Sequence, residues 1–354
     1  MVPRRRRSPG WLALALAVVP ILALAACGGG SGGGSAGPGA PRTTVRLGYF
    51  PNVTHGPAIV GVERGLFTRA LGDRVKLETA TFNAGPEATE ALFSGALDAA
   101  FVGPNPAINA FAKSHGQAIR IVAGSTSGGA SLVVKPGIER PADLKGKTLA
   151  TPQLGNTQDV ALRAWLRGQG LRADTTGGGD VSIRPQANAD TLSAFQGGQV
   201  DGAWVPEPWA TRLLEAGGKV LVDERQLWPD GRFVTTELVV RTDFLKEHPT
   251  AVRGLVDGLV QAIELAHADS AAAQRIVNDG IEHATTKRMG DATIASAWKN
   301  LTFTWDPLAA SLEKSKDDAV AAGLLQPVDL KGIYDLDLLN AVLTAHSQQQ
   351  VGGR

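Results

Sequence analysis

The sequence predicts an α/β protein built of two lobes. Three observations support this prediction: strand-like and helix-like segments alternate along most of the chain, one short phrase occurs twice, and the length suits two domains. The chain has 354 residues, of which 43% are hydrophobic and 19% charged, so it can bury two cores of ordinary size. Alternation of strands and helices favours mostly parallel sheets that helices cover on both faces.

The repeated phrase reads GALDAAFVGPNPA at 95–107 and GQVDGAWVPEPWA at 198–210. Both copies contain Asp, a small residue, Ala, an aromatic residue and Val, then Pro, a polar residue and Pro, and the first copy has one additional residue, Gly103. Each copy is expected to form a strand that runs into a loop and a helix, because Pro is tolerated in the first turn of a helix. Each lobe therefore presents an equivalent rim, and two facing rims make a cleft.

Residues 1–27 are expected to be a targeting signal. Four arginines at 4–7 precede an apolar run at 11–24 that is too short to span a bilayer comfortably. The run ends in Leu-Ala-Ala-Cys, which resembles the lipobox of bacterial lipoproteins, and that resemblance implies that Cys27 carries lipid. The alternative is an ordinary signal peptide with an incidental cysteine. Because Cys27 is the only cysteine, a disulfide framework or a cysteine metal site is excluded.

Residues 28–42 are rich in Gly and Ser and are expected to form a flexible tether. Removing the four leader arginines from the 35 basic residues leaves 31 against 34 acidic ones, a net charge of about −3. This balance does not indicate a nucleic-acid partner. The six histidines are scattered without metal-ligand spacing, so we expect no metal and no cofactor.

The first lobe is expected to comprise residues 43–130 and the second 131–238, and residues 239–354 are expected to return to the first lobe. Predicted first-lobe strands are 44–50, 75–82, 97–103 and 119–125. Predicted second-lobe strands are 131–135, 148–152, 181–186, the strand in the second copy of the repeated phrase, and 217–223, and the segment 235–244 is expected to close this unit. The segments SLVVK at 131–135 and ELVVR at 237–241 resemble each other, so we expect them to pair as the strands that link the lobes.

The chain after His248 is expected to be helical. Apolar residues recur there at helical spacing, which predicts one buried face formed by Val252, Leu255, Val256, Leu259, Val260 and Ile263.

Four segments together resemble the nitrate/sulfonate/taurine-type substrate-binding proteins of ABC importers, most like the aliphatic-sulfonate branch. They read VRLGYFPNVTHGPAIVGVERGLF, FNAGPEATEALFSGALDAAFVGPNPAINAF, TPQLGNTQDVALRAWL and FQGGQVDGAWVPEPWATRLL. The resemblance covers 44–325. It implies a type II periplasmic-binding-protein fold, in which a hinge joins two α/β lobes around a ligand cleft. It also implies delivery of a small anion to a membrane permease that a separate ATPase drives. We accordingly expect a monomer on the extracytoplasmic face of the cell membrane, held there by its lipid anchor.

Candidate ligand-binding residues follow from the strand ends, where ligands of open α/β sheets gather. In the first lobe they are Asn52, Thr54, His55, Asn83, Gly85 and Asn105; between the lobes they are Ser127 and Gly128; in the second lobe they are Asn156, Thr157, Gln158, Trp204 and Glu207. Several of these positions open helices, and helix N-termini favour anions. Each position also has a structural interpretation: Asn and Thr cap helices, Trp204 packs in the core, and Glu207 caps a helix instead of receiving a ligand amino group.

Two other classes of function stay open. Relatives on this fold are enzymes of cofactor biosynthesis, but the sequence has no nucleophile elbow, no His-Glu-x-x-His and no phosphate loop, so we expect no catalysis. A tethered sensor or adhesion module would not need two hinged lobes. Among ligands, aliphatic sulfonates lead, followed by taurine or nitrate and then a pyrimidine precursor.

Overall fold

The structure is a computed structural model that describes residues 43–352. The predicted signal peptide, Cys27 and the tether lie outside the described residues. Residues from Ala40 onward form one compact unit. Within the described part of the chain, no helix has the length and apolar character that a membrane span requires.

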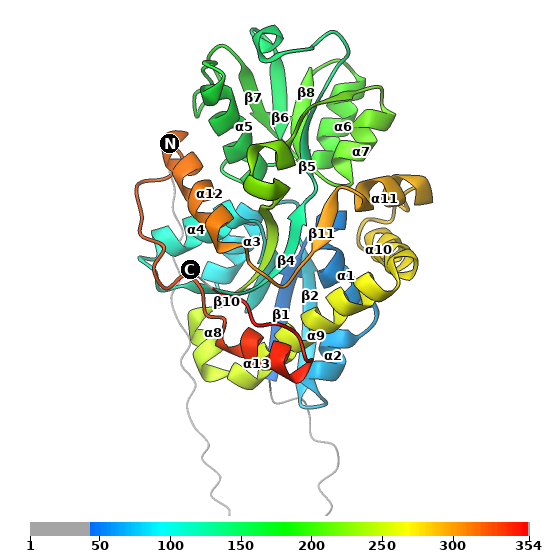
Figure 1. Cartoon of the computed structure of the whole chain (residues 1–354), viewed down its shortest axis with the longest axis vertical. Coiled ribbons are helices and arrows are strands. Elements are labelled where there is room, and N and C mark those ends of the chain that lie inside the picture. Colours follow the sequence, from blue (N-terminus) through cyan, green and yellow to red (C-terminus); the bar gives the residue numbers. More distant parts are fainter. Residues whose placement is uncertain (1–42, 353–354) are drawn as a thin grey trace, which may run out of the picture. The chain divides into compact units, whose positions relative to one another are not determined.

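The first sheet has six strands in the order β11-β4-β10-β3-β1-β2 (Figure 1). Strand β1 pairs in parallel with β2 and β3, whereas β10 runs antiparallel to β3 and β4, and β11 antiparallel to β4. The bounds are β1 Thr43–Tyr49, β2 Val75–Thr81, β3 Ala99–Val102, β4 Ile119–Gly128, β10 Val234–Arg241 and β11 Leu301–Phe303. We call this sheet and its helices the first lobe.

The second sheet has five strands in the order β7-β6-β8-β5-β9. Strand β6 is parallel to β7 and β8, and β5 is antiparallel to β8 and β9. The bounds are β5 Ala130–Val134, β6 Thr148–Thr151, β7 Ser182–Pro185, β8 Gly202–Pro206 and β9 Lys219–Asp223. We call this sheet and its helices the second lobe.

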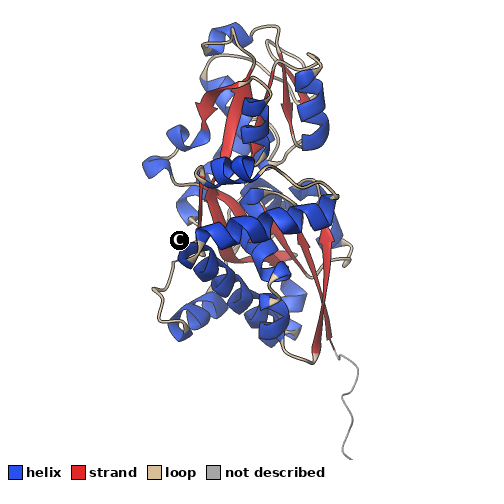
Figure 2. Cartoon of the chain, turned by 90° about the vertical axis from the view of Figure 1, so that its right-hand side faces the viewer, coloured by secondary structure: helices blue, strands red, loops and turns tan. Residues whose placement is uncertain are grey.

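Helices lie on both sides of the sheets (Figure 2). Those of the first lobe are α1 Gly56–Glu63, α2 Leu66–Leu71, α3 Gly85–Phe93, α4 Pro104–Lys113, α8 Thr242–Glu247, α9 Pro249–Ala268, α10 Ser270–Thr285, α11 Asp291–Trp298, α12 Ala309–Ala321 and α13 Asp337–Ala345. Those of the second lobe are α5 Thr157–Gly168, α6 Asn188–Gln196 and α7 Trp209–Glu215. Short 3-10 turns occupy Val53–His55, Pro141–Leu144, Glu224–Leu227 and Pro229–Gly231.

The two faces of the first sheet carry separate apolar cores. Along β10, Leu238 and Val240 contribute to the core beneath α1 and α9, and Val239 contributes to the opposite core beneath α4 and α12. This is the alternation that a strand buried on both faces imposes. The predicted apolar face of α9 is confirmed, since all six of its residues from Val252 to Ile263 are fully buried.

The repeated phrase forms equivalent strands, β3 and β8. Its aspartate accepts an equivalent backbone hydrogen bond in each lobe. Asp98 Oδ2 accepts a 2.9 Å hydrogen bond from the backbone N–H of Arg46 in β1. Asp201 Oδ2 accepts a 2.9 Å bond from the N–H of Thr148, where β6 begins. Each aspartate thus ties the phrase to the parallel strand beside it.

The segments SLVVK and ELVVR do not pair with each other, so that expectation is wrong. They occupy the same place in different sheets: Ser131 of β5 pairs with Val205 of β8, and Glu237 of β10 pairs with Val102 of β3. Their likeness therefore reflects equivalent positions in two similar lobes. The predicted boundary at 238/239 falls inside β10, which lies wholly in the first sheet.

The chain crosses from β4 to β5 through Gly128 and Gly129, whose φ angles are +79° and +77°. This left-handed conformation favours glycine because it has no Cβ.

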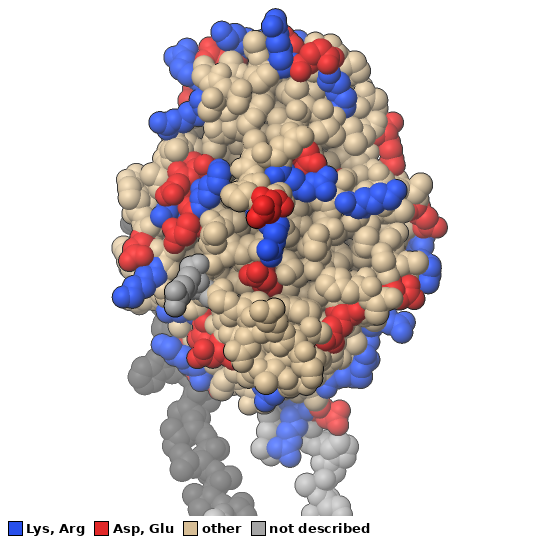
Figure 3. Space-filling view, viewed as in Figure 1, with Lys and Arg blue, Asp and Glu red and all other residues tan. Residues whose placement is uncertain are grey.

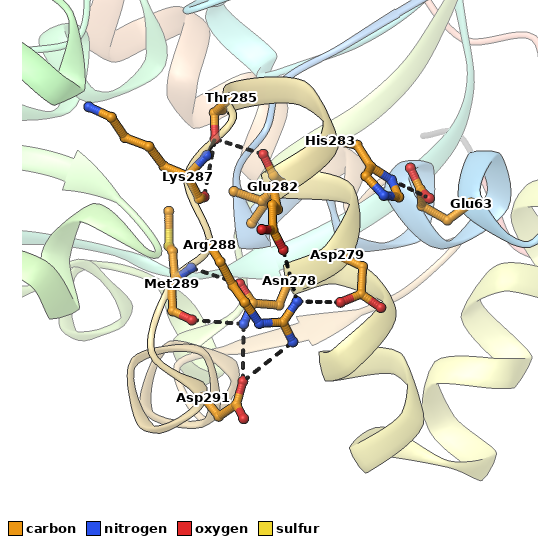
Figure 4. A network of polar contacts seen from close by, with 11 residues as sticks. Glu63, Asn278, Asp279, Glu282, His283, Thr285, Lys287, Arg288, Met289 and Asp291 are labelled. Atoms are coloured by element: carbon orange, nitrogen blue, oxygen red, sulfur yellow. Dashed lines mark hydrogen bonds and ion pairs between the residues drawn. The ribbon is translucent and has the colours of Figure 1, made fainter.

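Elsewhere in the first lobe, Arg288 ties the turn after α10 to neighbouring acidic side chains (Figure 4). It bonds Asp279 at 2.5 Å and Glu282 at 3.2 Å, which are exposed contacts that stabilise the fold little.

Candidate functional site

A cavity lies between the carboxyl ends of the parallel strands of both lobes. Its volume is about 30 Å³, which leaves room for about one or two water molecules. Its lining comprises Phe50, Asn52, Thr54, His55, Gly85, Gly103, Pro106, Asn156, Thr157, Gln158, Pro206 and Thr235. A larger groove of about 650 Å³ beside Phe111 and Leu325 is lined by the first lobe alone, so it is not a site that lobe closure would enclose.

Seven of the thirteen predicted site residues line this cavity: Asn52, Thr54, His55, Gly85, Asn156, Thr157 and Gln158. The other lining residues are not among those predicted: Phe50, Gly103, Pro106, Pro206 and Thr235. Thr235 was missed because β10 is antiparallel, so its first residues, rather than its last, reach the cavity. The alternation of VTTELVV alone does not give strand direction.

His55 lines the cavity as a neutral ring. Burial lowers its pKa to about 3, because an imidazolium loses its hydration there. The backbone N–H of Phe50 donates to Nδ1 at 3.3 Å, and the Phe50 ring packs on the imidazole with centroids 4.2 Å apart. Since Nδ1 accepts, the proton of the neutral ring is on Nε2. Within the described chain Nε2 has no protein partner, so it is a donor available to a ligand.

The N-terminus of α5 supplies the donors of the second lobe. Asn156 caps the helix by accepting from the N–H of Asp159 at 2.9 Å, and its own amide donates to Oε1 of Gln158 at 3.0 Å. The side-chain NH₂ of Gln158 is therefore left to donate elsewhere. The N–H groups of Thr157 and Gln158 occupy the first two helical positions and have no carbonyl partner within the helix.

The first lobe adds two further helix N-termini. In α3 and α4, the prolines at 86, 104 and 106 have no N–H, so the N–H groups without a partner within the helix are those of Gly85 and Glu87 in α3 and of Asn105 in α4. Thr235 closes the floor of the cavity, where its hydroxyl donates to the Gly128 carbonyl at 2.5 Å. Because that proton is engaged, the Thr235 oxygen faces a ligand only as an acceptor.

The cavity has no ionised wall. Its lining residues include no Asp, Glu, Lys or Arg, and His55 is neutral. Asp159, which follows Gln158, is paired with Arg163 at 2.9 Å, and both side chains are almost completely buried. On the face drawn in Figure 3, acidic and basic side chains are intermingled. An anion held here would therefore be stabilised by neutral donors and helix dipoles.

Four predicted residues lie near the cavity but have other partners or positions. Asn105 donates its side-chain amide to the Ser315 carbonyl at 3.0 Å, and Asn83 donates to the Pro152 carbonyl of the second lobe at 3.4 Å. Ser127 and Gly128 line an outer groove with Asn300 instead. None of the four lines the cavity. Asn105 instead joins α4 to α12 within the first lobe, and Asn83 bonds across to the second lobe.

Trp204 and Glu207 also do not line the cavity. Trp204 is completely buried in the second-lobe core, where its Nε1 donates to Glu224 at 2.7 Å. Glu207 accepts from the N–H of Thr211 at 3.1 Å, which caps α7, and from Asn300 Nδ2 at 2.7 Å. With both oxygens engaged, Glu207 is not placed to receive a ligand amino group. In the structure, therefore, Glu207 caps a helix and Trp204 packs in the core.

Besides the bond from Asn83 to Pro152, two hydrogen bonds at α7 and at the end of β8 join the lobes beside the cavity. Trp209 Nε1 in α7 donates to Asn52 Oδ1 at 2.9 Å. Asn300, which precedes β11, donates to Glu207 at the end of β8. Both bonds connect residues of the second lobe to the first, so they hold the cavity closed in this arrangement.

Comparison with known proteins defines the class of protein. The fold is that of the periplasmic binding proteins, as predicted. The alkanesulfonate-binding protein SsuA from Xanthomonas axonopodis pv. citri, bound to MOPS, superimposes with a TM-score of 0.65 and 21% identity over 82% of this chain and 96% of that one. The periplasmic nitrate-binding protein NrtA from Synechocystis PCC 6803 gives a TM-score of 0.69 with 16% identity, over 87% of this chain and 90% of that one.

Residues 38–278 match the NMT1-like family, and the chain belongs to that family. The taurine-binding periplasmic protein of Escherichia coli K12 is 31% identical over 206 residues, which make up 58% of this chain. The match spans 62% of that protein's length.

Proposed function

We propose that this protein is the extracytoplasmic solute-binding component of an ABC importer and captures a small anion, foremost an aliphatic sulfonate, between its lobes. The observation that carries the proposal is the closed cavity, in which the N-terminus of α5 faces the rims of α3 and α4. Helix N-termini bind oxyanions through free N–H groups and their dipoles.

A compact oxyanion suits the donors of this cavity. The donors come from three elements: the N–H of Gly85 from α3, the N–H groups of Thr157 and Gln158 from α5, and the ring N–H of His55 from the 3-10 turn after β1. A sulfonate has three oxygens that share one charge, so several separated donors can bind it together. The site avoids burying a second full charge, whose desolvation would be costly.

The lining favours a plain sulfonate over a zwitterion such as taurine. An ammonium group requires a carboxylate or several acceptors, and no acidic residue lines the cavity. The similarity to the taurine-binding protein of Escherichia coli supports taurine as the second candidate. The name of the nitrate-binding structural neighbour keeps nitrate as a third.

The partners and location follow from the same proposal. A permease and its ATPase would receive the anion, and a lipid on Cys27 followed by the tether of 28–42 would keep the protein beside them. Several acyl chains give durable attachment, whereas one chain binds a bilayer only marginally. We propose no catalytic step.

A thermal-shift panel tests the proposal, using the full chain with Cys27→Ser and ethanesulfonate, taurine, nitrate, bicarbonate and a pyrimidine as probes. A ligand at a hundred times its Kd stabilises its protein by about 2.7 kcal/mol. We expect the largest shift with ethanesulfonate.

The matched variants are Gln158→Glu and Gln199→Glu. Glu at 158 keeps the acceptor for Asn156 but places a negative charge in the cavity, so it should abolish the shift. Gln199 is exposed in the second lobe, so the same substitution there should preserve it. A response to the pyrimidine alone, or turnover of any probe, would overturn the proposal.

A further inference from the structure

Gly103 is the one residue by which the two copies of the repeated phrase differ in length. It follows β3 and caps α4, with φ −80° and ψ 170°. Those angles are ordinary extended backbone that any residue adopts. Conformational freedom therefore does not explain a glycine at this position.

Space explains it. A Cβ built on Gly103 would overlap Oγ1 of Thr157, and it would lie 3.3 Å from Thr157 Cβ and 3.2 Å from the Thr235 carbonyl oxygen. Thr157 is the first residue of α5 in the second lobe. The backbone of the first lobe thus meets a side chain of the second lobe at van der Waals distance, with no room for a methyl group between them.

This contact lies at the cavity itself. Gly103, Thr157 and Thr235 all line it, and the free N–H groups of α5 belong to the same helical turn as Thr157. Any displacement of Thr157 away from Gly103 also moves those donors away from the rim of α4. N–H···O bonds weaken quickly beyond about 3.2 Å. A shift of about one ångström would therefore leave the α5 donors too far from an anion that is bound at the rim of α4.

We infer that Gly103 sets the distance at which the lobes close, and with it the size of anion that the cavity accepts. This inference rests on the proposed function. A side chain at 103 would hold α5 away from the first lobe, so small anions would lose donors on one side. Rotation of the Thr157 side chain moves Oγ1 but leaves Cβ in place, so the effect should grow from Gly103→Ala to Gly103→Val.

The test measures lobe separation directly. Cys27 is the only cysteine, so the full chain with Cys27→Ser accepts a pair of spin labels at Glu87→Cys and Asp190→Cys. Both positions are exposed, one in the first turn of α3 and the other in the first turn of α6. Dipolar spectroscopy then gives the distance distribution, first without ligand and then with ethanesulfonate.

Four backgrounds are compared: the parent, Gly103→Ala, Thr157→Ala, and both together. We expect Gly103→Ala to deplete the short-distance population and to weaken ethanesulfonate binding about tenfold to a hundredfold. Removing Oγ1 in the double variant should restore the short distance, although affinity stays reduced because Thr157 belongs to the site. Gly168→Ala in α5, where a Cβ meets nothing within 4 Å, is the control and should behave as the parent does.

The inference is overturned if Gly103→Ala closes as the parent does, if the effects of the two substitutions simply add, or if the parent never populates the short distance. Circular dichroism melting of each variant identifies loss of fold. If Gly103→Ala alone does not fold, the comparison of the double variant with Thr157→Ala provides the steric test, because Oγ1 of Thr157 is absent from both. The ligand-free comparison needs no bound anion. A chain that binds none of the anions but still shows the coupling between 103 and 157 would contradict the proposed function and support this inference.

Discussion

The indole Nε1 of Trp209 in α7 donates a 2.9 Å hydrogen bond to Oδ1 of Asn52, which follows β1. The bond joins the second rim of the repeated phrase to the first loop of the other lobe, beside the cavity. It is therefore part of the closed arrangement rather than of either lobe alone. Removing this hydrogen bond should weaken closure of the lobes without disturbing the hydrophobic core of either lobe.

Replacing Trp209 by Phe should weaken anion binding about fivefold to tenfold. The ring remains, but the donor to Asn52 is lost, and a typical hydrogen bond contributes about 1 kcal/mol. Calorimetric titration with ethanesulfonate measures the change. Trp165→Phe, in the second lobe but outside the cavity lining, should bind as the parent does. Equal effects of both substitutions would contradict a role for the Trp209 bond in closure.

The two aspartates of the repeated phrase should differ in their effect on stability. Asp98 is 2% exposed and holds both the N–H and the guanidinium of Arg46, whereas the Asp201 side chain is 33% exposed. The Arg46 side chain is 39% exposed, so the pair is only partly buried. Neutralising a buried carboxylate that has these partners still costs more than neutralising an exposed one. In urea unfolding, Asp98→Asn should lose about 3 kcal/mol and Asp201→Asn about 1 kcal/mol. The reverse order would contradict the interpretation.

Much of this fold follows from sequence patterns. Strands such as 75–81 and the apolar face of α9 were predictable because periodicity reports burial directly. The pairing of SLVVK with ELVVR was not, since two segments at equivalent positions in similar lobes look the same as two segments that pair. Strand direction is equally invisible in a short apolar run, which is why the first residues of β10 were assigned to the wrong lobe.

The location of the site at the strand ends was predictable from the sequence, but the contacts of individual side chains were not. Asn156, Thr157 and Gln158 follow a strand and open a helix, and both signals are local. Whether Asn105 turns toward the cavity or toward Ser315 depends on α12, 210 residues away in the chain. The roles of Trp204 and Glu207 depend likewise on Glu224 and Asn300, which no local pattern connects to them.

Anion affinity should be independent of pH between about 6 and 9. Burial lowers the pKa of His55 to about 3, so the ring stays neutral throughout that range, and no acid or base otherwise lines the cavity. Titration with ethanesulfonate, which stays ionised, gives the profile. A rise in affinity as the pH falls through 6.5 would show that an imidazolium holds the anion and would contradict the neutral site.

Stability should fall as the pH rises from 4.5 to about 7 because of Glu224. Burial raises its pKa to about 7, despite the hydrogen bond from Trp204. In that interval the unfolded chain has released the proton and the folded chain retains it, so the folded state is increasingly disfavoured. The full loss is about 3 kcal/mol, at 1.36 kcal/mol for each pKa unit.

Glu224→Gln should make this fall in stability less steep while keeping the acceptor for Trp204. A smaller slope should remain, because burial also raises the pKa of Glu237 and of Glu207. Urea unfolding of the parent and the variant at several pH values, followed by tryptophan fluorescence, gives the comparison. Glu87→Gln at an exposed position serves as the control and should keep the slope of the parent. Parallel slopes for the parent and Glu224→Gln would assign the titration to another group.

The most direct measurement is calorimetric titration of the full chain, carrying Cys27→Ser, with ethanesulfonate, taurine and the uncharged ethyl methyl sulfone at pH 7.5. A cavity of neutral donors without an acidic wall should bind ethanesulfonate at least tenfold more tightly than taurine, a difference of about 1.4 kcal/mol, and should not bind the sulfone. Binding of the sulfone as tightly as the sulfonate, or a preference for taurine, would contradict the account.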